Sequence, residues 1–178
     1  MHNDTPTGVR LRRATTDDAA LLSRLGARLF EQTFAAANTA DDMAAYLAQT
    51  FHADAQAAEL ADDRCRVWFA EDDAGEPMGY VMLWRDSRTE SVDAKHPAEI
   101  QRIYVDRPYH GRGVANVMMR ACTVQAREWS CDVLWLAVWQ RNPRAIAFYE
   151  KCGLRRVGVK TFQLGSDLQH DYVMAQNL

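Results

Sequence analysis

The spacing of hydrophobic and polar residues predicts one strand and two helical regions in the first third of the chain. Residues 9–13 alternate between apolar and basic side chains, as in an edge strand. Thr15 or Thr16 can cap the following helix. The apolar stripe of that helix has helical spacing: Ala20, Leu21, Leu25 and Leu29. An alanine-rich second helical region covers about 39–61, with a break expected near His52.

In the rest of the chain, strand-like runs alternate with turns and helices. Strands are expected at residues 65–71, 79–85, 99–105 and 133–139. A polar turn at 73–76 predicts that the first two of these form a hairpin, and 86–97 is expected to be a polar loop. Helices are expected directly after Gly113 and over residues 143–153.

A glycine-rich loop, His110 to Gly113, joins the strand that ends near Val105 to the next helix. The free backbone N–H groups of a helix N-terminus, its dipole and the small glycines together suit a bound anion. We therefore expect a phosphorylated ligand here, with a tight turn that binds nothing as the alternative. The loop lacks the Gly-Lys-Ser/Thr of a nucleoside triphosphate loop, and Asn116 replaces the third glycine of the dinucleotide fingerprint.

A second strand-to-helix unit follows at residues 133–153. Its strand ends before Asn142, which suits an N-cap, and Pro143 suits the first helical position. Gly153 is typical of the residue just after a helix. Both units present a strand end and a helix start at one edge of a sheet, where open α/β sheets bind ligands.

These two segments resemble the motifs of the GCN5-related N-acetyltransferase superfamily. Members carry Arg/Gln-x-x-Gly-x-Gly/Ala after their fourth strand, and this chain has His-Gly-Arg-Gly-Val-Ala at 110–115. They carry Asn-x-x-Ala-x-x-Phe-Tyr-x-x-x-Gly after their fifth strand, which residues 142–153 match. His110 departs from the family's Arg or Gln, although it can still offer a donor. The resemblance implies an α/β (α+β) fold with a mixed, mostly antiparallel sheet of six or seven strands, splayed between strands 4 and 5 and flanked by about four helices.

The C-terminal stretch, residues 161–178, is similar to the terminal hairpin of the bacterial spermidine/spermine N-acetyltransferase branch. The resemblance implies an acetyl-CoA-dependent N-acetyltransferase that moves an acetyl group to a primary amine by direct transfer in a ternary complex. A polyamine is one candidate acceptor. The alternatives are a peptide or protein N-terminus, another small amine, a non-catalytic acyl-CoA-binding regulatory module, and a phosphate-binding interaction domain.

The resemblance also assigns contacts with acetyl-CoA. Strand backbone groups would pair with pantetheine like an added strand, the glycine-rich loop would wrap the pyrophosphate, and the helix after Asn142 would contact pantetheine. The implied cofactor-binding residues are Ile103, Tyr104, Val105, His110, Gly111, Arg112, Gly113, Val114, Ala115, Asn142, Phe148 and Lys151.

Two residues are candidates for the proton transfers. Tyr149 is expected to act as the general acid toward the leaving thiolate, because superfamily members often place this hydroxyl near the cofactor sulfur; a core aromatic is the alternative. Glu99 is expected to act as the general base, at the offset from the pantetheine-binding segment that histone-acetylating members show. By strand alternation Glu99, Gln101, Ile103 and Val105 share one face. The alternatives for Glu99 are contact with solvent or Arg102, with deprotonation through a water chain.

The sequence says less about the acceptor site. Aromatic faces and carboxylates suit a cationic acceptor, and the candidates are Phe30, Glu31, Phe34 and Trp84. An ordinary amphipathic helix end is the alternative explanation for the cluster around Glu31.

Composition narrows the class of protein. The 178 residues are expected to form one domain over 1–178, with a flexible tail at 1–8. A net charge of −3 predicts no nucleic-acid partner and no attraction to anionic membranes. No signal peptide is visible, so we expect a cytoplasmic protein. The four cysteines lack CxxC spacing, which favours reduced thiols and no metal. The expected partner is a small-molecule amine, and a homodimer is one expected assembly.

Overall fold

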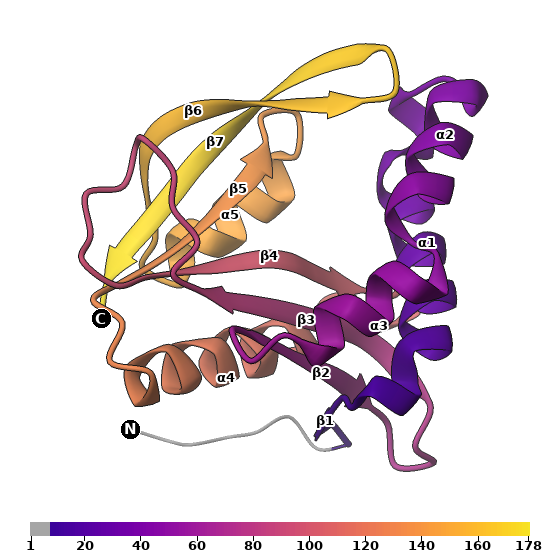
Figure 1. Ribbon diagram of the computed structural model, residues 1–178, viewed down its shortest axis with the longest axis horizontal. Helices are drawn as coiled ribbons and strands as arrows, with labels where there is room; N and C mark the ends of the chain where they lie inside the picture. The colour runs from indigo at the N-terminus through magenta and orange to yellow at the C-terminus, as the bar shows by residue number, and fades with distance from the viewer. Residues whose placement is uncertain (1–7) are drawn as a thin grey trace.

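A computed structural model describes residues 8–178, and the seven strands in that range form one sheet in the order β1-β2-β3-β4-β5-β7-β6 (Figure 1). The strands are β1 (Arg10–Arg13), β2 (Cys65–Glu71), β3 (Pro77–Arg85), β4 (Pro97–Val105), β5 (Val133–Trp139), β6 (Arg155–Leu164) and β7 (Asp167–Asn177). The helices are α1 (Ala19–Phe34), α2 (Ala40–Thr50), α3 (Ala53–Ala61), α4 (Val114–Glu128) and α5 (Pro143–Lys151). The predicted fold class is confirmed. Residues 1–7 of the expected N-terminal tail lie outside the described residues.

The alanine-rich region forms two helices, so residues 8–178 contain five α-helices where about four were expected. The break falls at Phe51 and His52, as predicted. His52 Nδ1 accepts a hydrogen bond from the backbone N–H of Ala55 at 3.2 Å, which caps α3. Phe51 is buried beside Phe30, so the kink is held by packing as well as by the cap.

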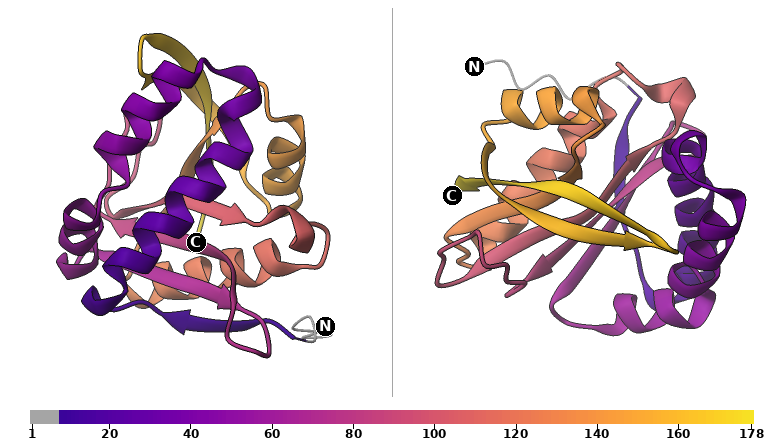
Figure 2. Two further views of the ribbon diagram at one scale, coloured as in Figure 1. Left: turned by 90° about the vertical axis from the view of Figure 1, so that its right-hand side faces the viewer. Right: turned by 90° about the horizontal axis from the view of Figure 1, so that it is seen from above.

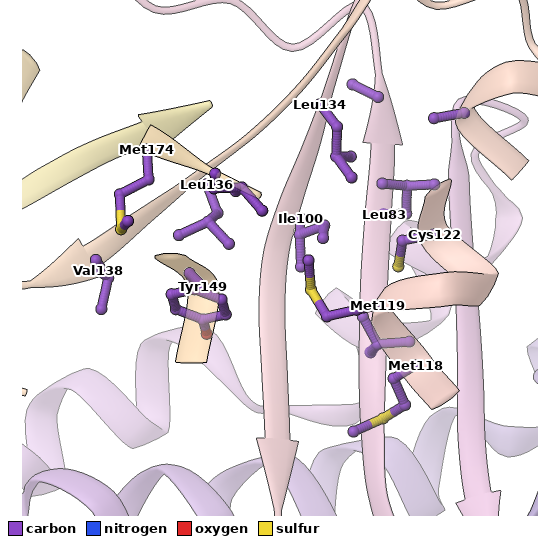
Figure 3. Close-up of a cluster of buried hydrophobic side chains, with 14 of the residues drawn as sticks. Leu83, Ile100, Met118, Met119, Cys122, Leu134, Leu136, Val138, Tyr149 and Met174 are labelled. Atoms are coloured by element: carbon purple, nitrogen blue, oxygen red, sulfur yellow. The ribbon is translucent and has the colours of Figure 1, made fainter. Parts of the chain in front are cut away.

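The sheet is covered by helices on both faces (Figures 1 and 2). Helices α4 and α5 share one face, where Leu83, Ile100 and Leu134 of the sheet pack against Met118 and Cys122 (Figure 3). The opposite face is covered by α1–α3, with Leu22, Leu25 and Leu29 of α1 among its buried residues. The two apolar layers hold the central strands between them.

Strands β4 and β5 are parallel but pair over only a short distance. Their register runs Pro97 to Val133, Ala98 to Leu134 and Glu99 to Trp135, and then stops. The other adjacent pairs of strands are antiparallel. Beyond Glu99 the two strands separate, which confirms the predicted splay between strands 4 and 5.

The expected common face of Glu99, Gln101, Ile103 and Val105 is wrong, because β4 contains a bulge. Leu83 of β3 pairs with Ile100, and Met82 pairs with Arg102, so Gln101 is the extra residue. The bulge reverses the alternation after it. Glu99 therefore shares the α1–α3 face with Arg102, whose guanidinium is 2.8 Å from a Glu59 carboxylate oxygen on α3. Ile103 packs against the opposite face.

Along the described chain, no helix is long and apolar enough to cross a membrane.

Candidate active site

The splay of β4 and β5 opens a cavity of about 820 Å³. Residues 100–105 of β4 line one wall and residues 136–139 of β5 line the other. The starts of α4 and α5 lie at one end, and the C-terminal part of α1 borders the other side. The cavity thus joins a split sheet edge to two helix N-termini, the arrangement that the two sequence motifs predict.

The glycine-rich loop has the backbone geometry that requires glycine. Gly111 has φ +79° and Gly113 has φ +82°, both in the left-handed region. Gly113 is the N-cap of α4 and has no side chain to cap the helix. Val114, Ala115 and Asn116, in the first turn of α4, line the cavity, and no N-cap side chain satisfies the backbone N–H groups of this turn. This is an anion-binding geometry.

His110 joins the loop to α5. One ring nitrogen, Nδ1, lies 2.8 Å from Arg144 Nη1, and the other, Nε2, lies 2.7 Å from the carbonyl oxygen of Val105. Because Arg144 can only donate, Nδ1 accepts and Nε2 donates to Val105. Both nitrogens thus contact protein groups, so His110 holds Arg144 beside the loop. The expected donor from His110 to a ligand is not presented in this arrangement.

The start of α5 forms as its sequence predicts. Asn142 is the N-cap, and its Oδ1 accepts a hydrogen bond from the backbone N–H of Ala145 at 3.1 Å. Pro143 occupies the first helical position. Asn142 and Phe148 both line the cavity, as expected for residues that contact a pantetheine chain.

Glu99 lies where the two strands part. Its residue is only 8% exposed, and Ser87 Oγ donates a hydrogen bond to its Oε2. Trp135 Nε1 in turn donates to the Ser87 carbonyl oxygen at 2.9 Å. Burial raises the pKa of Glu99 above its ordinary value, and the Ser87 hydrogen bond and the positive charges of Lys160 and Arg102 only partly oppose this. A buried carboxylate with a raised pKa on the cavity wall suits proton acceptance.

Tyr149 belongs to the apolar layer (Figure 3) and also lines the cavity. It is 8% exposed, and its ring contacts that of Phe148 with a centroid separation of 5.3 Å. Burial raises the pKa of its phenol above the ordinary value, with Cys152 as a smaller cause. The hydroxyl therefore stays protonated near neutral pH and can donate.

Four residues expected at the site lie away from the cavity wall. The Arg112 guanidinium stacks over the Tyr109 ring at 5.6 Å, and Lys151 is exposed at the end of α5. Glu31 is exposed on α1, and Trp84 packs in the α1-side core with Arg64 over its ring. The residues that the cavity does bring together are Phe30, Phe34, Glu99, Ile103, Tyr104, Val105, His110, Gly111, Gly113, Val114, Ala115, Asn142, Phe148 and Tyr149.

The sequence interpretation missed the wall formed by the C-terminal hairpin. Lys160 and Asp171 pair across β6 and β7 and line the cavity, as do Tyr46 of α2 and Trp139 of β5. No local pattern signalled this wall: Asp171 lies on the same face of β7 as Gln169 and Val173, and only the structure shows that these two neighbours are buried.

Comparison with known proteins identifies the family. The model of the acetyltransferase (GNAT) family matches residues 28–154. An uncharacterized N-acetyltransferase from the pepI 3′ region of Lactobacillus delbrueckii subsp. lactis is 34% identical over 173 residues, covering 97% of this chain and 99% of that protein. The chain therefore belongs to the GNAT family and is an enzyme of the N-acetyltransferase class.

Solved structures share the fold. The PaiA N-acetyltransferase of Thermoplasma acidophilum, in complex with coenzyme A, has a TM-score of 0.76 and 14% identity, covering 97% of this chain and all of that one (100%). Mutant forms of the spermidine/spermine N-acetyltransferase SpeG of Vibrio cholerae have a TM-score of 0.67 and 18% identity, covering 96% and 94%. At these identities the likeness concerns the fold.

Proposed function

We propose that this protein transfers an acetyl group from acetyl-CoA to a primary amine of a small molecule, directly and in a ternary complex. The observation that carries the proposal is the cavity between β4 and β5, which has uncapped helix N–H groups at one end and the buried Glu99 at its vertex. The fold likeness to a coenzyme A complex supports it.

The residues present suit acetyl-CoA. The N–H groups at the start of α4 would hold the pyrophosphate, with the Arg144 guanidinium beside them. Backbone groups of Ile103 and Val105 would pair with the pantetheine amides, although the Val105 carbonyl already accepts from His110. Asn142 Nδ2 offers further donors. When bound, acetyl-CoA supplies the thioester carbonyl that the amine attacks.

Glu99 and Tyr149 would carry the proton transfers. Glu99 would accept the proton of the attacking amine, and its raised pKa brings it nearer the operating pH. Tyr149 would donate a hydrogen bond to the developing thiolate, because its own raised pKa keeps the hydroxyl protonated. The amine nitrogen gains the acetyl group, the carbon–sulfur bond breaks, and the thiolate is protonated.

The contacts of the β6–β7 hairpin with α2 and Asn38, beside the cavity, favour a small acceptor over a protein chain. The tip of the β6–β7 hairpin reaches α2 (Figure 2), where the Ser166 backbone N–H donates to Asp42 Oδ1. Gln169 Nε2 also donates to Asn38 Oδ1 at 2.6 Å. A peptide N-terminus would have to enter beneath these contacts. A polyamine is one small amine that fits, and the fold likeness to SpeG is consistent with it.

The test is an amine panel with acetyl-CoA that includes polyamines, amino acids, aminoglycosides and a peptide N-terminus. Thiol release and mass-spectrometric detection of the acetylated amine are both followed. The proposal expects amine-dependent thiol release with one acetyl-amine formed per thiol. Binding of acetyl-CoA without transfer to any amine would favour the regulatory module, and transfer confined to peptides would overturn the small-acceptor proposal.

A further inference from the structure

Aromatic rings from four elements line the acceptor side of the cavity. They are Phe30 and Phe34 of α1, Tyr46 of α2, Trp139 of β5 and Phe162 of β6. Their ring centroids form a continuous chain of contacts. Phe30 lies 4.5 Å from both Phe34 and Tyr46, Tyr46 lies 5.5 Å from Phe162, and Phe34 lies 5.9 Å from Trp139. We call these five residues the aromatic wall.

Asp171 of β7 brings a carboxylate to this wall. It pairs with Trp139 on one side and with Lys160 on the other. Its Oδ1 is buried and accepts no hydrogen bond from any group within residues 8–178. An unsatisfied buried acceptor is costly, so the arrangement lacks a donor that a ligand can supply.

Lys160 forms no ion pair with Asp171, although the two are register partners. The Lys160 ammonium lies 5.4 Å from the centre of the Trp135 ring, toward the end of the cavity where Glu99 lies. In the described chain, Asp171 forms no ion pair within 4.0 Å. Burial also raises the pKa of Asp171 to about 6, against the opposing effects of Lys160 and His170. The carboxylate still has capacity for a cation.

Asp171 is too far from Glu99 to bind the reacting amine. Glu99 pairs with Trp135 and Asp171 pairs with Trp139, four positions further along β5. At strand spacing this corresponds to about 13 Å along the sheet. A group held by Asp171 is therefore a second group of the same acceptor.

We propose that Asp171 and the aromatic wall form a subsite for a second cationic group of the acceptor, at the far end from the reacting amine. A carboxylate supplies a charge-assisted hydrogen bond to an ammonium, and the ring faces attract the same charge. The acceptor class is a primary amine that carries another ammonium at a distance comparable with the strand offset of about 13 Å just described. This inference rests on the proposed function, because it takes the cavity to bind an acetyl acceptor.

The test is calorimetry with the full chain and α,ω-diaminoalkanes of increasing length. Each diamine is compared with the amino alcohol of equal length, in which a hydroxyl replaces the second ammonium. The wild type should bind the best diamine at least about tenfold tighter than its amino alcohol. Asp171→Asn should reduce that preference to less than about threefold while leaving amino-alcohol affinity unchanged. Asp63→Asn removes the same charge at an exposed turn and should keep the preference.

Equal binding of diamine and amino alcohol by the wild type would overturn the proposed subsite. A preference for the diamine that survives Asp171→Asn would also overturn it. Turnover of the same compounds separates the two proposals. Diamine-selective binding without acetylation of any amine would contradict the proposed function and leave the subsite supported. Acetylation of amines without diamine-selective binding would support the proposed function and contradict the subsite.

Discussion

Glu99 of β4 lies opposite Trp135 of β5 at the last position where the two strands pair. The indole N–H of Trp135 donates a hydrogen bond to the Ser87 carbonyl oxygen, and the Ser87 hydroxyl donates one to the Glu99 carboxylate. The residue proposed to accept the proton is thus fixed by the strand that forms the opposite wall of the cavity. The position of the proposed base, Glu99, therefore depends on where β4 and β5 separate.

Gly113→Glu should weaken acetyl-CoA binding at least about tenfold, or about 1.4 kcal/mol. The side chain would add bulk and negative charge where the α4 N–H groups face the proposed pyrophosphate. Gly75→Glu is the matched control, because Gly75 also has a positive φ, +86°, but lies in the β2–β3 turn. Calorimetry should show a loss of affinity only for Gly113→Glu. Equal affinities would remove the loop from the cofactor site.

His110 and Arg144 should act as a unit in acetyl-CoA binding. His110→Ala releases Arg144 from its position beside the loop, so each single substitution should weaken binding and the double variant should lose little more. A double-mutant cycle should give a coupling of about 1 kcal/mol. Arg155→Gln removes a similar charge on exposed β6 and should have no effect. Additive losses would show that the bridge does not position Arg144.

Tyr149→Phe should lower kcat more than it raises KM for acetyl-CoA. The expected loss lies somewhat below the general-acid range of about 10²–10⁴, because a thiolate is a good leaving group. The ring keeps its contact with Phe148, so the free energy of unfolding should change by no more than about 1 kcal/mol. Tyr172→Phe, outside the cavity wall, is the control. A wild-type kcat would make Tyr149 a core residue only.

Asp171→Asn should stabilise the protein near neutral pH. The folded pKa is raised to about 6 from 3.8, so the folded state binds the proton more tightly than the unfolded state. The charged form is therefore penalised above about pH 6, and the penalty disappears as the pH falls toward about 4. Urea unfolding should show a gain for the variant near pH 7 that vanishes in acid. A gain that grows in acid would contradict this sign.

The helices and strands, and the turns that lead into α4 and α5, were predictable because their signals are local. Strand runs such as 65–71 and 133–139 and the cap at Asn142 depend on neighbouring residues, and each forms where expected. The bulge at Gln101 is set by pairing with β3, so alternation along β4 alone wrongly grouped Glu99 with Ile103 and Val105 on one face. The position of Asp171 beside Tyr46 and Trp139 depends on the hairpin meeting α2, which no local pattern encodes.

The most direct test of Glu99 as the general base is the pH–rate profile of kcat/KM for the amine, in the wild type and in Glu99→Gln. The wild-type profile should rise with pH through an apparent pKa above that of an ordinary glutamate, because burial raises the pKa of Glu99 and only its deprotonated form accepts a proton. Glu99→Gln should lower the rate by roughly 10²–10⁴ and abolish this rise, with acetyl-CoA affinity unchanged. A variant that keeps both the rise and the rate would contradict the role of Glu99 as the base of this site.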